Sequence, residues 1–159
     1  MSYCVNQIVQ LATDIYQEIG SPSSLSVGFI SGWLVDSGNL GSINNKLSSS
    51  FYLTGDAPCI TDDGGNFGGE EADIYTLMFK TYFYEGQSLS VLAGGGSYWT
   101  SLSEGDTKIS RTDVTKIAQA YLNLQKTAKE DLRLAIYDYK LRISVPQSVD
   151  SASIYSFPS

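Results

Sequence analysis

The most apolar segment of the chain lies at residues 70–88, "EEADIYTLMFKTYFYEGQS", and predicts a helix from about residue 70 to residue 92. With 3.6 residues per turn, its apolar side chains surround most of the helix instead of forming one stripe. These side chains are Ile74, Leu77, Met78, Phe79, Tyr82 and Phe83. Because one chain of 159 residues has little to place against every side of such a helix, we expect neighbouring copies to cover part of it.

Four other segments have helical or partly helical patterns. Residues 2–19 carry apolar side chains at steps of three and four, and residues 24–35 predict a second, shorter helix. Residues 36–47 contain two glycines and predict only a short helical turn. Residues 112–140 carry a continuous apolar stripe, which predicts the longest element, a helix on the order of 40 Å in length.

The remaining segments lack a helical period. Residues 48–69 predict a long loop, and residues 98–110 predict a strand–turn–strand hairpin. Residues 141–159 contain two prolines and predict an extended C-terminal arm that cannot bury itself alone. The expected fold is therefore mainly α: a single helical domain over residues 1–140, similar to a four-helix bundle, with a small β-hairpin, a long loop and the arm.

Composition and charge narrow the function. Charged residues make up only 17% of the chain, against about 25% in soluble domains, and a surface with little charge favours association. The net charge is −7 and the ten basic residues are scattered in the sequence, which argues against tight DNA binding. Histidine is absent, which excludes Ser-His-Asp and Cys-His catalysis and imidazole metal ligands. We expect no enzymatic activity, no cofactor and no metal.

The two cysteines, Cys4 and Cys59, do not form a CxxC pair. They are expected to be free thiols in a reducing compartment. No continuous apolar run reaches the 18 or so residues of a membrane span, and no signal-peptide pattern is present. The expectation is a soluble protein that is intracellular or belongs to an assembly built inside a cell.

Two groups of carboxylates are candidate chemical sites. The spacing of Asp62 and Asp63 does not fit a calcium-binding loop, and whether they bind a cation together with Glu70 stays open. Glu104 and Asp106 could form an acid–base pair, but they flank a glycine and are better explained as turn residues. Neither group predicts a catalytic site.

Four stretches resemble the head–tail connector, or adaptor, proteins of tailed bacteriophages. They are "GWLVDSGNLGSINNKL" (32–47), "EEADIYTLMFKTYFYEGQ" (70–87), "LSEGDTKIS" (102–110) and "AYLNLQKTAKEDLRLAIYDYKL" (120–141). The resemblance implies a helical virion subunit that forms a ring, usually twelve-fold, between portal and tail. It also implies assembly in the host cytoplasm, contacts with portal and with tail or neck proteins, and genomic DNA that passes through the lumen without sequence-specific binding.

Aromatic and apolar residues of the central helix, the hairpin and the arm are the expected subunit or partner interface, because large amphipathic side chains are common at protein interfaces. They are Tyr75, Phe79, Tyr82, Phe83, Tyr98, Trp99, Val145, Val149, Ile154, Tyr155 and Phe157. The eleven tyrosines and the arm also allow an alternative function, a protein-binding domain or assembly chaperone that is not part of a virion.

Overall fold

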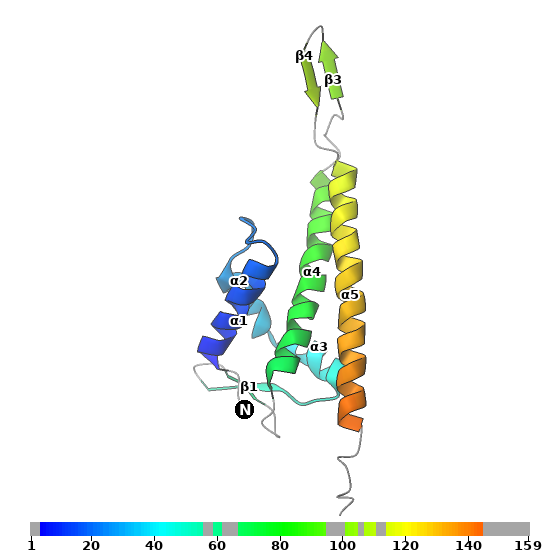
Figure 1. Cartoon of the computed structure of the whole chain (residues 1–159). Coiled ribbons are helices and arrows are strands. Elements are labelled where there is room, and N and C mark those ends of the chain that lie inside the picture. The colour runs from blue at the N-terminus through cyan, green and yellow to red at the C-terminus, as the bar shows by residue number, and fades with distance from the viewer. Residues whose placement is uncertain are drawn as a thin grey trace, which may run out of the picture.

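The computed structural model describes residues 4–55, 59–61, 67–94, 101–104, 107–110 and 114–144. This part of the chain contains five helices: α1 (Val5–Glu18), α2 (Val27–Leu34), α3 (Ser37–Leu47), α4 (Gly69–Gly94) and α5 (Val114–Ser144). It also contains two antiparallel two-stranded sheets, β1 (Tyr52–Thr54) with β2 (Cys59–Thr61) and β3 (Ser101–Glu104) with β4 (Thr107–Ser110). Figure 1 shows α4 and α5 as a long side-by-side pair with the β3–β4 hairpin at one end and α1–α3 packed beside the other half.

The fold is mainly helical with a small antiparallel hairpin, as the sequence predicts, but a four-helix bundle is not found. Three short helices pack around the lower half of one long antiparallel pair (Figure 1). Helix α5 ends at Ser144, so residues 141–144, predicted to begin the arm, are helical. One continuous cluster of buried side chains includes members from all five helices.

Helix α3 is longer than the predicted turn because its first turn is strongly capped. The Asp36 carboxylate accepts hydrogen bonds from the backbone N–H groups of Gly38 (2.9 Å) and Asn39 (3.2 Å). At its other end, the Asn44 side chain donates to the Phe51 carbonyl (2.8 Å) and accepts from the Phe51 N–H (2.7 Å). Capping of this kind contributes about 1 kcal/mol and offsets part of the cost of two helical glycines.

The segment predicted as a loop, residues 48–69, contains the short β1–β2 hairpin. Strand β1 pairs with β2 in the register Tyr52 with Thr61 and Thr54 with Cys59. Phe51, directly before β1, is buried in the core. The loop prediction was therefore wrong for the two strands, whereas residues 56–58 and 62–66 lie outside the described part of the chain.

The expectation of two free thiols was wrong, because Cys4 and Cys59 form a disulfide. Cys4 lies directly before α1, and Cys59 is the first residue of β2. The bond therefore ties the start of the first helix to the β1–β2 hairpin. Because the two cysteines lie 55 residues apart in the chain, no local sequence pattern indicates that they meet.

A cluster of aromatic rings joins α2 to α4. The centroid of the Trp33 ring lies 5.3 Å from Tyr75, 5.2 Å from Phe79 and 5.8 Å from Tyr82. The Tyr75 hydroxyl donates a hydrogen bond to the Leu34 carbonyl at the end of α2 (2.8 Å). Burial, and secondarily the Asp36 carboxylate, raises the pKa of the Tyr75 hydroxyl above its usual range, so this group stays protonated.

This packing changes the expectation about the apolar girdle of α4. The side chains of Ile74, Met78, Phe79 and Phe83 are buried within the single chain. Helices α1–α3 cover one side of α4 and α5 covers another (Figure 1). These four side chains therefore need no neighbouring copy to shelter them, whereas Leu77 is partly exposed and Tyr82 is 49% exposed. That neighbouring copies cover part of the girdle stays a prediction for these two residues.

Candidate interaction surfaces

The structure separates the predicted interface residues into core and surface positions. Tyr75 and Phe79 have no exposed surface and belong to the core of the chain, and Phe83 is nearly buried. Tyr82 is half-exposed and lies on the surface of α4. The other seven predicted residues lie outside the described part of the chain: Tyr98, Trp99, Val145, Val149, Ile154, Tyr155 and Phe157.

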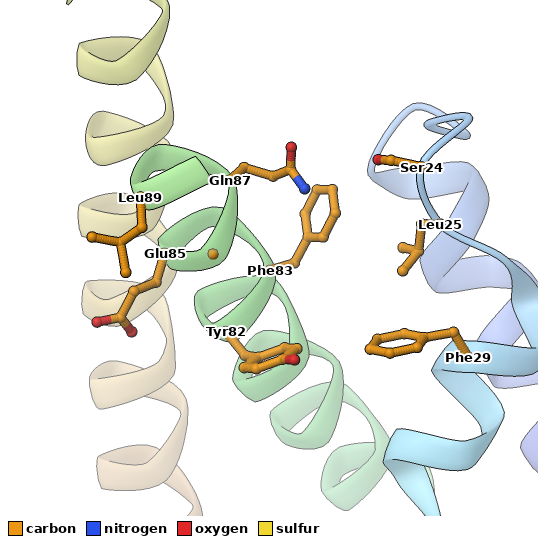
Figure 2. A pocket seen from close by; sticks show the side chains of 9 residues that line it. Ser24, Leu25, Phe29, Tyr82, Phe83, Glu85, Gln87 and Leu89 are labelled. Atoms are coloured by element: carbon orange, nitrogen blue, oxygen red, sulfur yellow. The ribbon is translucent and has the colours of Figure 1, made fainter. Parts of the chain in front are cut away.

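An apolar cleft of about 470 Å³ lies between the start of α2 and the C-terminal half of α4. Figure 2 shows the rings of Phe29 and Tyr82 pointing toward one another across this cleft, with Phe83 above them. Phe29 is 50% exposed, and Leu89 also lines the cleft from α4. We call this space the α2–α4 cleft. Of its three aromatic side chains, Phe29 and Tyr82 are half-exposed in the described part of the chain.

A second concave surface of about 580 Å³ lies between α3, α4 and α5, with Trp33 of α2 also in its lining, and we call it the three-helix groove. Its lining has an apolar part and a basic part. The apolar side chains are Trp33, Met78, Leu132 and Ile136, and the basic side chains are Lys46, Lys129 and Arg133. Lys46 comes from α3 and the other two come from α5, so positive charge stands on two sides of the groove, with Glu85 of α4 as an acidic member.

A stripe of apolar side chains runs along the surface of α5 that points away from α4. Leu134, Tyr137 and Leu141 are 44%, 58% and 46% exposed. Their spacing of three and four residues places them on one face of the helix. Exposed carboxylates at Glu130, Asp131 and Asp138 accompany them, and we call the six residues the outer face of α5.

Sequence reasoning missed this outer face, although a signal for it exists. The predicted apolar stripe of residues 112–140 contains Leu132, Ile136 and Tyr139, which point toward the rest of the fold. Leu134 and Leu141 are off that stripe and repeat at seven residues. An amphipathic helix packed on one side only would carry polar residues at these positions.

A buried polar contact fixes the end of α5 against the start of α4. The Glu71 carboxylate accepts hydrogen bonds from the Gly68 backbone N–H (2.9 Å) and from the Tyr139 hydroxyl (2.8 Å). Both side chains are buried. Beside them, Arg142 forms an ion pair with Glu70. Glu70, one of the three carboxylates considered for a cation, therefore has a basic partner, whereas Asp62 and Asp63 lie outside the described residues.

Replacing Tyr139 with phenylalanine is expected to lower the free energy of unfolding by about 2 kcal/mol, because the buried Glu71 carboxylate loses a hydrogen-bond donor. Urea unfolding followed by circular dichroism measures the change. Tyr137→Phe on the exposed face of the same helix is the matched control and should change stability by less than about 0.5 kcal/mol. Equal stability of Tyr139→Phe and the wild type would contradict this role of the Glu71–Tyr139 contact.

Elsewhere among the described residues, the titratable groups form no metal-binding cluster. Burial foremost, then the Glu18 carboxylate and Tyr121, raises the pKa of the Tyr84 hydroxyl. No group of three or more His, Cys, Asp or Glu side chains able to hold a metal ion occurs among the described residues. Glu104 lies on β3, and Asp106 is outside the described residues. In the part of the chain that the structure describes, no helix is long and apolar enough to span a membrane.

In comparisons with known proteins, the chain matches no protein-family model, no curated protein and no solved structure.

Proposed function

We propose that this protein is a non-enzymatic structural subunit of a tailed-bacteriophage virion, a head–tail connector of the adaptor type that forms a ring between portal and tail. The observation that carries the proposal is the outer face of α5. After the chain has buried its own core, Leu134, Tyr137 and Leu141 remain exposed in one line. Apolar and tyrosine-containing helical faces of this kind are typical of surfaces that contact other proteins.

Self-association through two different surfaces is the arrangement that produces a ring. The three-helix groove and the outer face of α5 share no residue, so they are not one self-complementary patch. Contacts between unlike surfaces of identical subunits close into rings when the rotation between copies allows it. The net charge of −7, repeated around such a ring, would repel DNA phosphates from the lumen wall and let the duplex pass without binding.

The proposed position of the ring is between two layers of the neck, and the elongated α4–α5 pair supports it. The β3–β4 hairpin extends from one end of this pair, and α1–α3 with β1 lie toward the other end (Figure 1). Such a subunit presents different elements in two directions along its long axis. A portal protein on one side and a tail or neck protein on the other are the partners that we propose.

Light scattering after size exclusion, together with electron microscopy of purified particles, tests this function. The wild-type protein is expected to form an oligomer of defined size and to occupy the neck of the particle. Leu134→Ser/Tyr137→Ser/Leu141→Ser should shift the purified protein to monomer, because the outer face of α5 is then polar. Val9→Ser/Leu53→Ser, at two exposed apolar positions on other elements, is the matched control and should still form the oligomer.

A wild-type protein that stays monomeric at about 100 µM and is absent from purified particles would contradict the connector function. Its presence in infected lysate, without incorporation into particles, would instead favour the assembly-chaperone alternative.

A further inference from the structure

We infer that neighbouring copies of this chain bind head to tail, with the outer face of α5 of one copy seated in the three-helix groove of the next. This inference rests on the proposed function, since it requires that the chain self-associates. It deepens that function by naming the two surfaces that meet. It commits to a second copy of this chain as the occupant of the groove.

The groove has the chemistry of a receptor for an acidic amphipathic helix. Trp33, Met78, Leu132 and Ile136 supply apolar surface, and Lys46, Lys129 and Arg133 supply positive charge. Three of the ten basic residues of a chain with net charge −7 are thus gathered at one concave surface.

The outer face of α5 has the complementary chemistry. Asp131, Leu134, Asp138 and Leu141 follow one another at steps of three and four residues, so carboxylates and leucines alternate along one side of the helix. Tyr137 adds an exposed aromatic ring beside them. A helix that carries apolar anchors at this spacing docks into apolar grooves, and its flanking charges select the partner.

The two surfaces lie on opposite sides of α5, so one copy can use both at once. Leu132 lines the groove and Leu134 belongs to the outer face. Two residues apart on a helix are separated by about 200° around its axis. Each copy can therefore insert its outer face into one neighbour while its own groove receives the other neighbour. Contacts of this heterologous type generate rings.

The apolar floor of the groove favours a second copy over a nucleic acid as the occupant. A phosphate backbone would satisfy the lysines but would leave the apolar floor uncovered, whereas the outer face of α5 supplies both carboxylates and apolar side chains. Glu130 already forms hydrogen bonds of 3.1 and 2.7 Å with Arg133 of the same copy. The charges free to pair between copies are therefore best probed at Lys46 and Lys129 on the groove and at Asp131 and Asp138 on the outer face.

Paired charge reversals test the inference in the full-length protein. The groove variant is Lys46→Glu/Lys129→Glu and the face variant is Asp131→Lys/Asp138→Lys. Either variant alone places like charges at every contact between copies, and we expect self-association to weaken on the order of 100-fold. An equimolar mixture restores opposite charges at every contact of an alternating ring, and we expect the oligomer to return in light scattering. Circular dichroism should show unchanged helical content in both variants.

Matched controls carry the same changes in net charge at exposed positions that do not line the groove or the outer face. Lys126→Glu/Lys140→Glu controls the groove variant, and Asp14→Lys/Asp73→Lys controls the face variant. Both controls should assemble as the wild type does. Fluorescence anisotropy of a labelled short DNA duplex tests whether a nucleic acid occupies the groove instead. We expect the wild type and the groove variant to show the same lack of duplex binding.

The outcomes separate this inference from the proposed function. Suppose that the wild type forms an oligomer but both charge-reversal variants form it too, or that the mixture of variants fails to restore it. The proposed head-to-tail contact is then wrong, whereas the proposed ring is not contradicted. Duplex binding that depends on Lys46 and Lys129 would also overturn the inference. A wild type that is monomeric under all conditions would overturn both.

Discussion

Replacing Cys59 with serine is expected to lower the free energy of unfolding by about 4 kcal/mol under oxidising conditions, the largest effect of any single change outside the aromatic core. The disulfide with Cys4 closes a loop across a separation of 55 residues. In the chain-entropy model, a cross-link of that span lowers the conformational entropy of the unfolded state. This stabilises the folded state by on the order of 4 kcal/mol. Urea unfolding of the oxidised proteins, with the disulfide verified by mass spectrometry, measures the difference.

The control for this prediction is chemical. In the presence of dithiothreitol the wild type should lose nearly the same stability, and the variant should lose none, so that the two unfolding curves converge. The double variant Cys4→Ser/Cys59→Ser should match the reduced wild type. Curves that differ equally with and without the reductant would show that serine acts through packing and not through the cross-link.

Replacing Phe79 with alanine is expected to cost about 3–5 kcal/mol of stability in the dilute monomer, the usual range for a fully buried phenylalanine. The Phe79 side chain has no exposed surface, meets Trp33 edge to face and stacks on Phe83 at 6.3 Å. Its removal leaves a cavity at the point where α2 and α4 meet. Urea unfolding at low protein concentration measures the loss.

Tyr82→Ala, one turn further along α4, is the matched control. Tyr82 also contacts Trp33, at 5.8 Å, but half of its surface is open, so we expect a loss of only about 1 kcal/mol. Comparison of the two variants shows whether the Phe79 side chain acts in the core of one copy or at an interface between copies. If Phe79→Ala unfolds like the wild type when dilute but fails to assemble when concentrated, Phe79 acts between copies as the sequence predicted.

The sequence predicts elements whose signals are local. The apolar period locates α1, α4 and α5 to within a few residues, and the segment predicted as strand–turn–strand, residues 98–110, contains both strands of the β3–β4 hairpin. The start of α3 depends on a contact between Asp36 and two N–H groups, which also is local but competes with the glycine pattern. At this helix the Asp36 cap outweighs the helix-weakening effect of its two glycines.

The sequence could not predict features that depend on contacts between residues far apart in the chain. The Cys4–Cys59 disulfide and the hydrogen bond between Tyr139 and Glu71 join residues 55 and 68 positions apart. The burial of Phe79 depends on Trp33, which reaches it only when α2 crosses α4. For the same reason, lysines that are scattered in the sequence, such as Lys46 and Lys129, meet at one groove only after α3 packs beside α5.

The length of the α4–α5 pair has a consequence for anything that binds its two ends. The Glu71–Tyr139 and Glu70–Arg142 contacts anchor one end, and the β3–β4 hairpin extends from the other. The 31 residues of α5 span about 46 Å, so the pair acts as a spacer of set length between two bound bodies. One extra helical turn in both α4 and α5 would lengthen this spacer by about 5.4 Å. The number of helical turns alone would then set the distance between the two bound bodies.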